Sequence, residues 1–203
     1  MIAQAADGER GFAHTWWTVI GSDRFETSSP YFTTCIRELK RLEKFDATVA
    51  AAPQEVALAM HEPSANSWWP SVVIIPFFEA VGAVGGAQLV RAMARAAVYN
   101  SISAIIRPFV AVLIAISGPS PATFFSRYPQ LTQAGLKGVR FTWVSTGAKV
   151  GTLTLDYPCP VPKVFVEIWL AAFEYTFEVS KCAGEATRVQ HLGQQLIFEL
   201  AWQ

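Results

Sequence analysis

The chain has 203 residues, 16 basic and 16 acidic residues that cancel to zero formal net charge, and a hydrophobic fraction of 52%. This length suits one domain with a full core, the hydrophobic fraction excludes general disorder, and the balanced charge argues against a nucleic-acid binder. Charged residues make up only 16%, against about 25% in typical soluble domains, so we expect either an unusually large core or an apolar surface covered by a subunit, a partner or a ligand.

The N-terminal part is predicted as a flexible segment, residues 1–11, followed by a single α+β domain, residues 12–203. Residues 14–20 (HTWWTVI) predict a short strand or an extended arm, with Trp16 and Trp17 on opposite faces. The first residues lack the order of a signal peptide. The three cysteines are too few and too widely spaced for a disulfide framework or a zinc site. Both observations favour a cytoplasmic location. The cysteines are Cys35, Cys159 and Cys182.

Helices are predicted over most of residues 29–135. Ser29-Pro30 is a strong helix start, and that helix is expected to run to about Lys44, with a second over residues 53–60. Residues 61–70 read as a loop that exposes Trp68 and Trp69. A helix that begins after Pro76 is expected to break at the glycines 82, 85 and 86, before another helix over residues 87–100.

Residues 101–117 are apolar nearly all round and predict a central helix. The most hydrophobic stretch, residues 102–116, is shorter than the roughly 20 residues of a membrane span and contains Arg107 and Pro108. We therefore expect no membrane span here. Ser120-Pro121 predicts the start of a further short helix that carries Phe124 and Phe125.

The last third predicts two strands, one long helix and two more strands. Alternation of apolar and polar residues marks the strands, and an apolar stripe at helical spacing marks the helix. This β-β-α-β-β order favours an antiparallel sheet on which the N-terminal helical layer packs. The expected ranges are 138–145, 149–156, 162–182 for the helix, 187–191 and 195–202.

Aromatic side chains from several of these segments are expected to meet between the helices and the sheet. An apolar pocket with a few polar groups is the usual small-molecule site, and a fully packed interior is the alternative. The candidate ligand-binding residues are Phe77, Phe78, Tyr99, Arg107, Phe109, Phe124, Trp169 and Phe173.

Motifs for chemistry are missing from the sequence. It has no nucleophile elbow, phosphate-binding loop or dinucleotide fingerprint, and its three histidines lack metal-ligand spacing. Glu167, Glu174 and Glu178 share one helix and are interpreted as a solvent-facing stripe. We therefore expect no catalytic residues, no metal and no enzymatic activity. A lyase or isomerase that uses Tyr99 or Arg107 is a weaker alternative.

From Val72 to Trp202, the order of segments resembles a group of myxobacterial domains of unknown function. The similar segments are SPATFFSRYPQLTQAG, FTWVSTGAKVGTLTLDYP and the closing FELAW. These domains look like relatives of vinyl-reductase-type and haem-NO-binding sensory folds and of TRAPP-type trafficking subunits. The resemblance implies an α+β domain, commonly dimeric, that holds an apolar molecule between helices and sheet.

Departures from those families bear on the cofactor. Haem-NO-binding domains use a tyrosine-x-serine-x-arginine motif for the haem propionates, whereas the segment from Tyr99 has Ser103 in place of the arginine. Cys159, Cys182 and His191 are poorly spaced for the metal site of vinyl-reductase-type domains. Neither haem nor zinc is therefore expected. Cys35 lies in an early helix, as does the acylated cysteine of some trafficking subunits.

Taken together, the sequence predicts a non-enzymatic, homodimeric sensory domain that holds a small apolar ligand, a lipid or an aromatic molecule, and signals to a protein partner. The alternative is an adaptor with a solid interior that docks a partner through exposed aromatic residues. The residues expected to do so are Trp16, Trp17, Trp68 and Trp69.

Overall fold

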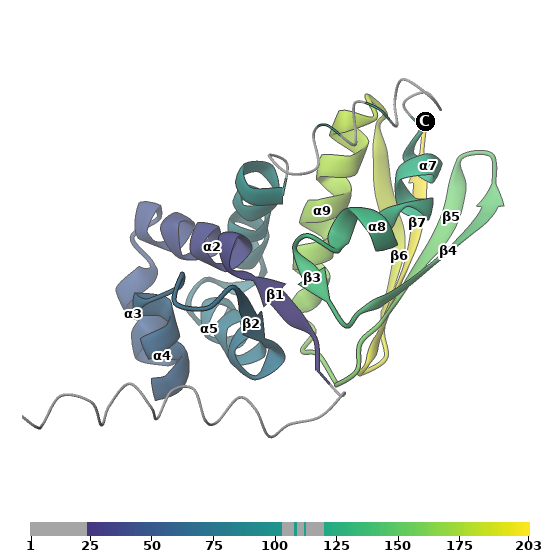
Figure 1. Ribbon diagram of the computed structural model, residues 1–203. Helices are drawn as coiled ribbons and strands as arrows, with labels where there is room; N and C mark the ends of the chain where they lie inside the picture. Colours follow the sequence, from purple (N-terminus) through teal and green to yellow (C-terminus); the bar gives the residue numbers. More distant parts are fainter. Residues whose placement is uncertain (1–23, 103–107, 109–111, 113–119) are drawn as a thin grey trace, which may run out of the picture.

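The computed structural model describes residues 24–102, 108, 112 and 120–203 (Figure 1). The predicted N-terminal segment, the strand at residues 14–20 and most of the helix at 101–117 lie outside these residues. So do four candidate site residues: Trp16, Trp17, Arg107 and Phe109.

The N-terminal half is a layer of helices, as predicted. Buried apolar side chains on one stripe of each helix drive this packing. In chain order the elements are β1 (Glu26–Ser28), α2 (Ser29–Arg41), α3 (Phe45–Ala51), α4 (Gln54–His61), β2 (Trp68–Pro70), α5 (Ser71–Ala97) and the π-helical turn η1 (Val98–Ile102).

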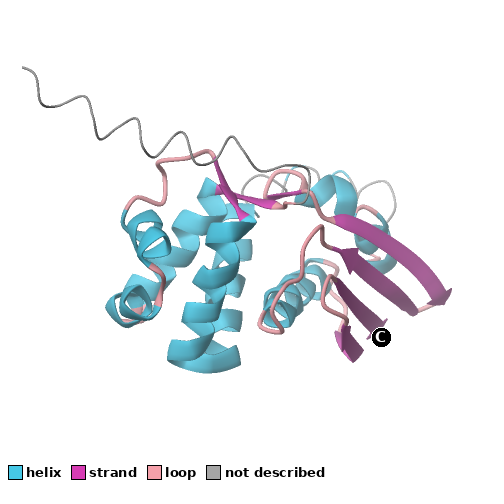
Figure 2. Cartoon of the chain, turned by 90° about the horizontal axis from the view of Figure 1, so that it is seen from below, coloured by secondary structure: helices cyan, strands magenta, loops and turns pink. Residues whose placement is uncertain are grey.

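The C-terminal half is an antiparallel sheet with helices on one face (Figure 2). Its strand order is β4-β5-β7-β6, and the predicted α+β class and β-β-α-β-β order are confirmed. The elements are α7 (Pro121–Ser126), α8 (Tyr128–Thr132), β3 (Leu136–Lys137), β4 (Arg140–Gly147), β5 (Val150–Asp156), α9 (Phe165–Val179), β6 (Gly184–His191) and β7 (Gln195–Trp202).

Helix α9 is the middle layer of the molecule. On one side Phe173 meets Phe198 of β7, with ring centroids 4.8 Å apart. On the other side α9 packs against α5, the longest helix. Along β7 every second residue is buried, from Leu196 to Trp202, which confirms the predicted inward face. The helical half and the sheet are therefore joined through α9.

Two short elements differ from the sequence-based expectation. Residues 45–51 form α3, because Phe45 and Thr48 turn into the core and hold this stretch as a helix. Trp68–Pro70 forms β2, which pairs with β1 in a small sheet of order β2-β1-β3. Three-residue strands are too short to show the alternation that predicts a strand.

The glycine break predicted within residues 82–86 is confirmed at Gly86. This residue has φ 64° and ψ −165° and divides α5 into two helical segments. Only glycine adopts this conformation readily. The first segment begins at Ser71 rather than after Pro76, which lies inside the helix.

The segment Ser71–Asn100 is long and apolar enough to cross a membrane by length and composition. In this structure it is the central helix of the helical half, in contact with α2, α3, α4 and α9. Its buried positions include Ile74, Phe77, Phe78 and Met93. In its most apolar 18-residue window 39% is buried, so packing within the protein accounts for part of its apolar character.

Both edge strands of the four-stranded sheet carry a bulge. The register shifts between Ser145 and Gly147 in β4, and between Ala186 and Arg188 in β6. The two bulges lie at the same end of the sheet, beside Gly151 and Leu200 of the inner strands.

Substitution Gly86→Ala should lower the free energy of unfolding by about 1–3 kcal/mol, because an L side chain is strained in this conformation. Steric overlap does not contribute to this loss, since an added Cβ would meet no atom within 4 Å. Thermal unfolding measures the change. The control Gln88→Ala, at an exposed position of the next turn, should stay within about 0.5 kcal/mol. Equal effects for both variants would contradict the role assigned to Gly86.

Candidate functional site

A partly enclosed cavity of about 110 Å³ lies where the helical half meets α9. We call it the central cavity. Its walls come from both halves of the molecule: Tyr31 of α2 and Phe78 of α5 on one side, Tyr128 of α8 and Trp169 of α9 on the other. The lining side chains that the structure describes are apolar or carry a hydroxyl, and none is charged.

Three predicted ligand-binding residues line the central cavity, namely Phe78, Phe124 and Trp169. Two others lie in packed core instead. The Phe77 ring meets Phe32 edge-on, and Phe173 packs against the sheet. Helical spacing predicted Trp169 and Phe173 as inward-facing, and the other three were expected inside because their segments converge. Neither argument distinguishes a cavity wall from solid core.

Tyr99 is not part of the cavity wall, contrary to our expectation. Its hydroxyl donates a hydrogen bond to the Glu178 carboxylate on the partly exposed side of α9. Burial, and secondarily this hydrogen bond, raise the pKa of Tyr99 to about 12. Tyr99 therefore belongs to a polar contact between two helices.

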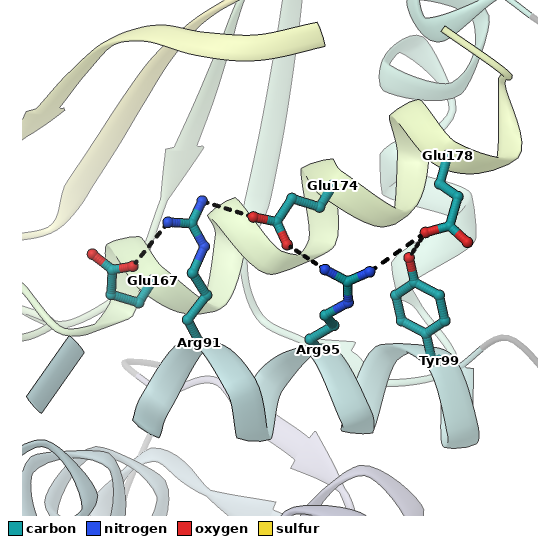
Figure 3. A network of polar contacts seen from close by, with 6 residues as sticks. All are labelled: Arg91, Arg95, Tyr99, Glu167, Glu174 and Glu178. Atoms are coloured by element: carbon teal, nitrogen blue, oxygen red, sulfur yellow. Dashed lines mark hydrogen bonds and ion pairs between the residues drawn. The ribbon is translucent and has the colours of Figure 1, made fainter. Parts of the chain in front are cut away.

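That contact is part of a polar seam formed by Arg91, Arg95, Tyr99, Glu167, Glu174 and Glu178 (Figure 3). The Arg91 guanidinium lies 2.9 Å from the Glu174 carboxylate and 3.7 Å from Glu167. Arg95 lies 3.4 Å from the same Glu174. The carboxylates interpreted as a solvent stripe thus pair with α5. The arginines and Tyr99 share one helix face because they are spaced by four residues.

The two described tryptophans of the predicted docking group differ in exposure. Trp68 is partly exposed, and the Lys137 ammonium lies 3.6 Å from the centre of its ring. Trp69 is buried at 4% exposure, contrary to our expectation, because its ring packs on Phe32 and its indole N–H donates to the Pro63 carbonyl. Trp69 is therefore a core residue rather than an exposed docking residue.

Most hydroxyl groups around the central cavity are engaged within the protein. The Tyr128 and Thr176 hydroxyls are 2.6 Å apart, and the Trp169 indole N–H donates to the Tyr157 hydroxyl at 2.7 Å. Burial raises the pKa of Tyr128 and of Tyr157. These phenols therefore stay neutral at physiological pH.

Tyr31 is the exception among the cavity tyrosines. It is 7% exposed, and its hydroxyl has no hydrogen-bond partner among the described residues. Burial is the main cause that raises the pKa of Tyr31, followed by the nearby Cys35 and Tyr157 side chains. The sequence analysis did not single out Tyr31, although it lies four residues, about one helical turn, before the buried Cys35.

The cysteines and acidic residues show no metal site within the described part of the chain, where no group of three potential ligands gathers. Cys35 is fully buried, and burial raises the pKa of its thiol. A buried thiol with a raised pKa is a poor nucleophile. The expectation of no metal stays a prediction.

Comparison with known proteins places the fold. The chain matches no protein-family model and no curated protein sequence. Among solved structures it is similar to the Fe(II) unliganded H-NOX protein from K. algicida, with a TM-score of 0.62, 12% identity and coverage of 87% of this chain and 96% of that one.

Two further matches have TM-scores of 0.51. One comes from a study of heme distortion in the H-NOX family, with 14% identity and coverage of 87% and 94%. The other is an oxygen-binding H-NOX domain related to soluble guanylate cyclases, with 13% identity and coverage of 84% and 92%. The fold is therefore H-NOX-like. The vinyl-reductase, TRAPP and myxobacterial parts of the resemblance stay predictions.

These neighbours contradict the prediction that the chain has no cofactor, since the matched proteins are Fe(II) and heme proteins. The described lining of the central cavity nevertheless does not fit a haem. It contains no histidine, cysteine or methionine to bind iron, and no arginine or lysine to pair with propionates. Tyrosine binds haem iron as the phenolate, and burial raises the pKa of Tyr31, Tyr128 and Tyr157 and so keeps these phenols protonated.

The sequence extends this mismatch beyond the described lining. Residues 100–120 contain no histidine, cysteine, methionine or tyrosine, and none of the five tyrosines is followed by serine and arginine at the motif spacing. Among the described residues, the groups available to hold a cofactor in the central cavity are apolar walls and hydroxyl groups.

Substitution Glu174→Gln should weaken the polar seam, because Glu174 pairs with both Arg91 and Arg95. The pairs are partly exposed, so we expect a loss of about 0.5–1 kcal/mol at low salt and a smaller loss in 1 M salt, where the screening length is about 3 Å. Thermal unfolding at both salt concentrations checks this. Glu79→Gln, an exposed carboxylate of α5, is the control. A loss that salt does not reduce would contradict an electrostatic seam.

Proposed function

We propose, from the H-NOX-like fold and the central cavity together, that this chain is a non-enzymatic sensory domain that binds a small molecule and signals to a protein partner. The observation that carries the proposal is an uncharged, largely apolar cavity whose walls come from both halves of the molecule. Apolar cavities of this kind bind small molecules rather than water.

The size of the cavity bounds the ligand. Pockets for drug-sized molecules have volumes of about 300–1,000 Å³, and an apolar cavity of about 150 Å³ holds benzene. At about 110 Å³, the central cavity suits a molecule of about one aromatic ring unless its walls move apart.

The position of the cavity couples ligand binding to the charged residues at the surface. Helices α5 and α9 supply facing walls, through Phe78 and Trp169, and the same helices carry the polar seam. Because Gly86 divides α5 between Phe78 and the seam arginines, the link runs through α9, which carries Trp169 of the wall and the seam carboxylates. A ligand that shifts α9 changes the distances between these carboxylates and Arg91 or Arg95. Occupancy of the cavity is thereby linked to a partly exposed row of charges that a partner can contact.

The proposal also includes a cytoplasmic location and a homodimer. These two parts and the protein partner are supported by the sequence alone. The adaptor alternative requires a solid interior, and the central cavity speaks against it. Trp68 is the one described tryptophan of the docking group with an exposed edge.

Toluene is a suitable probe of the central cavity. In the unmodified chain, saturating toluene should raise the melting temperature, since a ligand at a hundredfold excess over its Kd stabilises a protein by about 2.7 kcal/mol. Ala172→Leu places a larger side chain in the cavity wall and should abolish the toluene response while leaving stability unchanged or higher. Ala83→Leu, at an exposed site of α5, should retain it.

Native mass spectrometry of the freshly purified chain then tests whether a small molecule is bound to it. A non-covalent adduct that Ala172→Leu removes and Ala83→Leu retains would support the proposal. A chain without adduct, whose melting temperature toluene does not change, would overturn it.

A further inference from the structure

One residue that lines the central cavity carries a buried hydroxyl without a hydrogen-bond partner among the described residues. Three buried side-chain atoms lack a hydrogen-bond partner among the described residues, the Tyr31 hydroxyl, the Arg91 Nε and the Ser180 hydroxyl. Of these residues only Tyr31 lines the cavity. An unsatisfied buried hydroxyl destabilises a protein, so its retention requires an explanation.

We propose that Tyr31 determines which ligand the cavity accepts, by donating a hydrogen bond to an oxygen acceptor on an uncharged and otherwise apolar molecule. This inference rests on the proposed function and assigns a chemical class to its ligand: a small aromatic or aliphatic carbonyl or ether compound.

The direction of the hydrogen bond follows from what the hydroxyl lacks. A tyrosine hydroxyl can both donate and accept. Among buried backbone groups, donors are left unpaired less often than acceptors, which have two lone pairs, and we apply the same preference to the phenol O–H. The Tyr31 hydroxyl is shielded from water as well as unpartnered. A ligand acceptor that reaches it, after a small turn of the ring toward the cavity, does not have to displace water from the donor. The hydrogen bond is therefore worth more than one at a hydrated surface.

The absence of charge in the ligand follows from the walls. No described lining residue is charged, and burial of an unpaired charge is costly. Burial also raises the pKa of Tyr31, so the phenol remains a neutral donor. A carboxylate ligand would find no cation among these walls.

Four other hydroxyls of the cavity lining are less suited to this role. Tyr128 is paired with Thr176, and the Thr132 hydroxyl donates to the Tyr128 carbonyl. Tyr157 already accepts from Trp169. A ligand would have to compete with these internal bonds, whereas Tyr31 has none to break among the described residues.

Two probes of nearly identical shape test the inference. Acetophenone has a carbonyl oxygen where α-methylstyrene has a CH₂ group. We expect the ratio of the acetophenone affinity to the α-methylstyrene affinity to be about tenfold higher for the unmodified chain than for Tyr31→Phe. A factor of about ten corresponds to one well-made hydrogen bond. Isothermal titration and thermal shifts give both affinities, and benzoate serves as the charged analogue, which should bind most weakly.

Stability provides an independent readout. Tyr31→Phe removes an unsatisfied hydroxyl, so the melting temperature of the ligand-free chain should stay equal or rise. The matched control Tyr128→Phe removes a satisfied hydroxyl from the same cavity, so its melting temperature should fall while the preference for acetophenone remains.

The outcomes separate this inference from the proposed function. If α-methylstyrene binds and Tyr31→Phe leaves the acetophenone preference unchanged, the assignment of Tyr31 is wrong and the sensory proposal stands. Tighter binding of benzoate than of acetophenone would also overturn the assignment. If toluene binds and neither acetophenone nor α-methylstyrene binds any variant, the Tyr31 assignment fails alone. If toluene also leaves the melting temperature unchanged and the purified chain carries no adduct, the sensory proposal fails and the Tyr31 assignment fails with it.

Discussion

The structure depends on a single helix that must pack on two sides. Helix α9 buries Phe173 and Phe177 toward the sheet and Phe165 toward the helical half. A helix with apolar side chains on two faces needs a neighbour on each of them, and the β-β-α-β-β order supplies the sheet on one. The remaining side must be covered by helices from the other half of the chain. The two halves therefore form one core rather than two domains.

The central cavity and the polar seam are two results of this arrangement. Large rings such as Phe78 and Phe165 meet edge-on across the junction and leave a cavity beside them. Farther along the same junction, an ion pair between Arg91 of α5 and Glu174 of α9 connects the two helices. Tyr31 lies in the apolar part, where its hydroxyl is covered but not paired.

The architecture was predictable because period-two and period-3.6 patterns are strong in the last third of the chain. The strand β7 and the break at Gly86 both follow from local residue choice. The seam was not predicted, because its partners are 79 residues apart in the case of Tyr99 and Glu178. The role of Tyr31 could not be predicted either, since periodicity shows that a side chain is buried but not whether its hydroxyl finds a partner.

The paired bulges in β4 and β6 limit how copies of this chain can associate. A regular edge strand offers a row of free N–H and C=O groups to which another chain can add. A bulge disrupts that row and bends the strand, and here both edges are disrupted at the level of Leu200. Continuous β-sheet extension from one molecule to the next is therefore blocked at this end on both edges, which favours contacts between side chains over backbone pairing in any assembly of the chain.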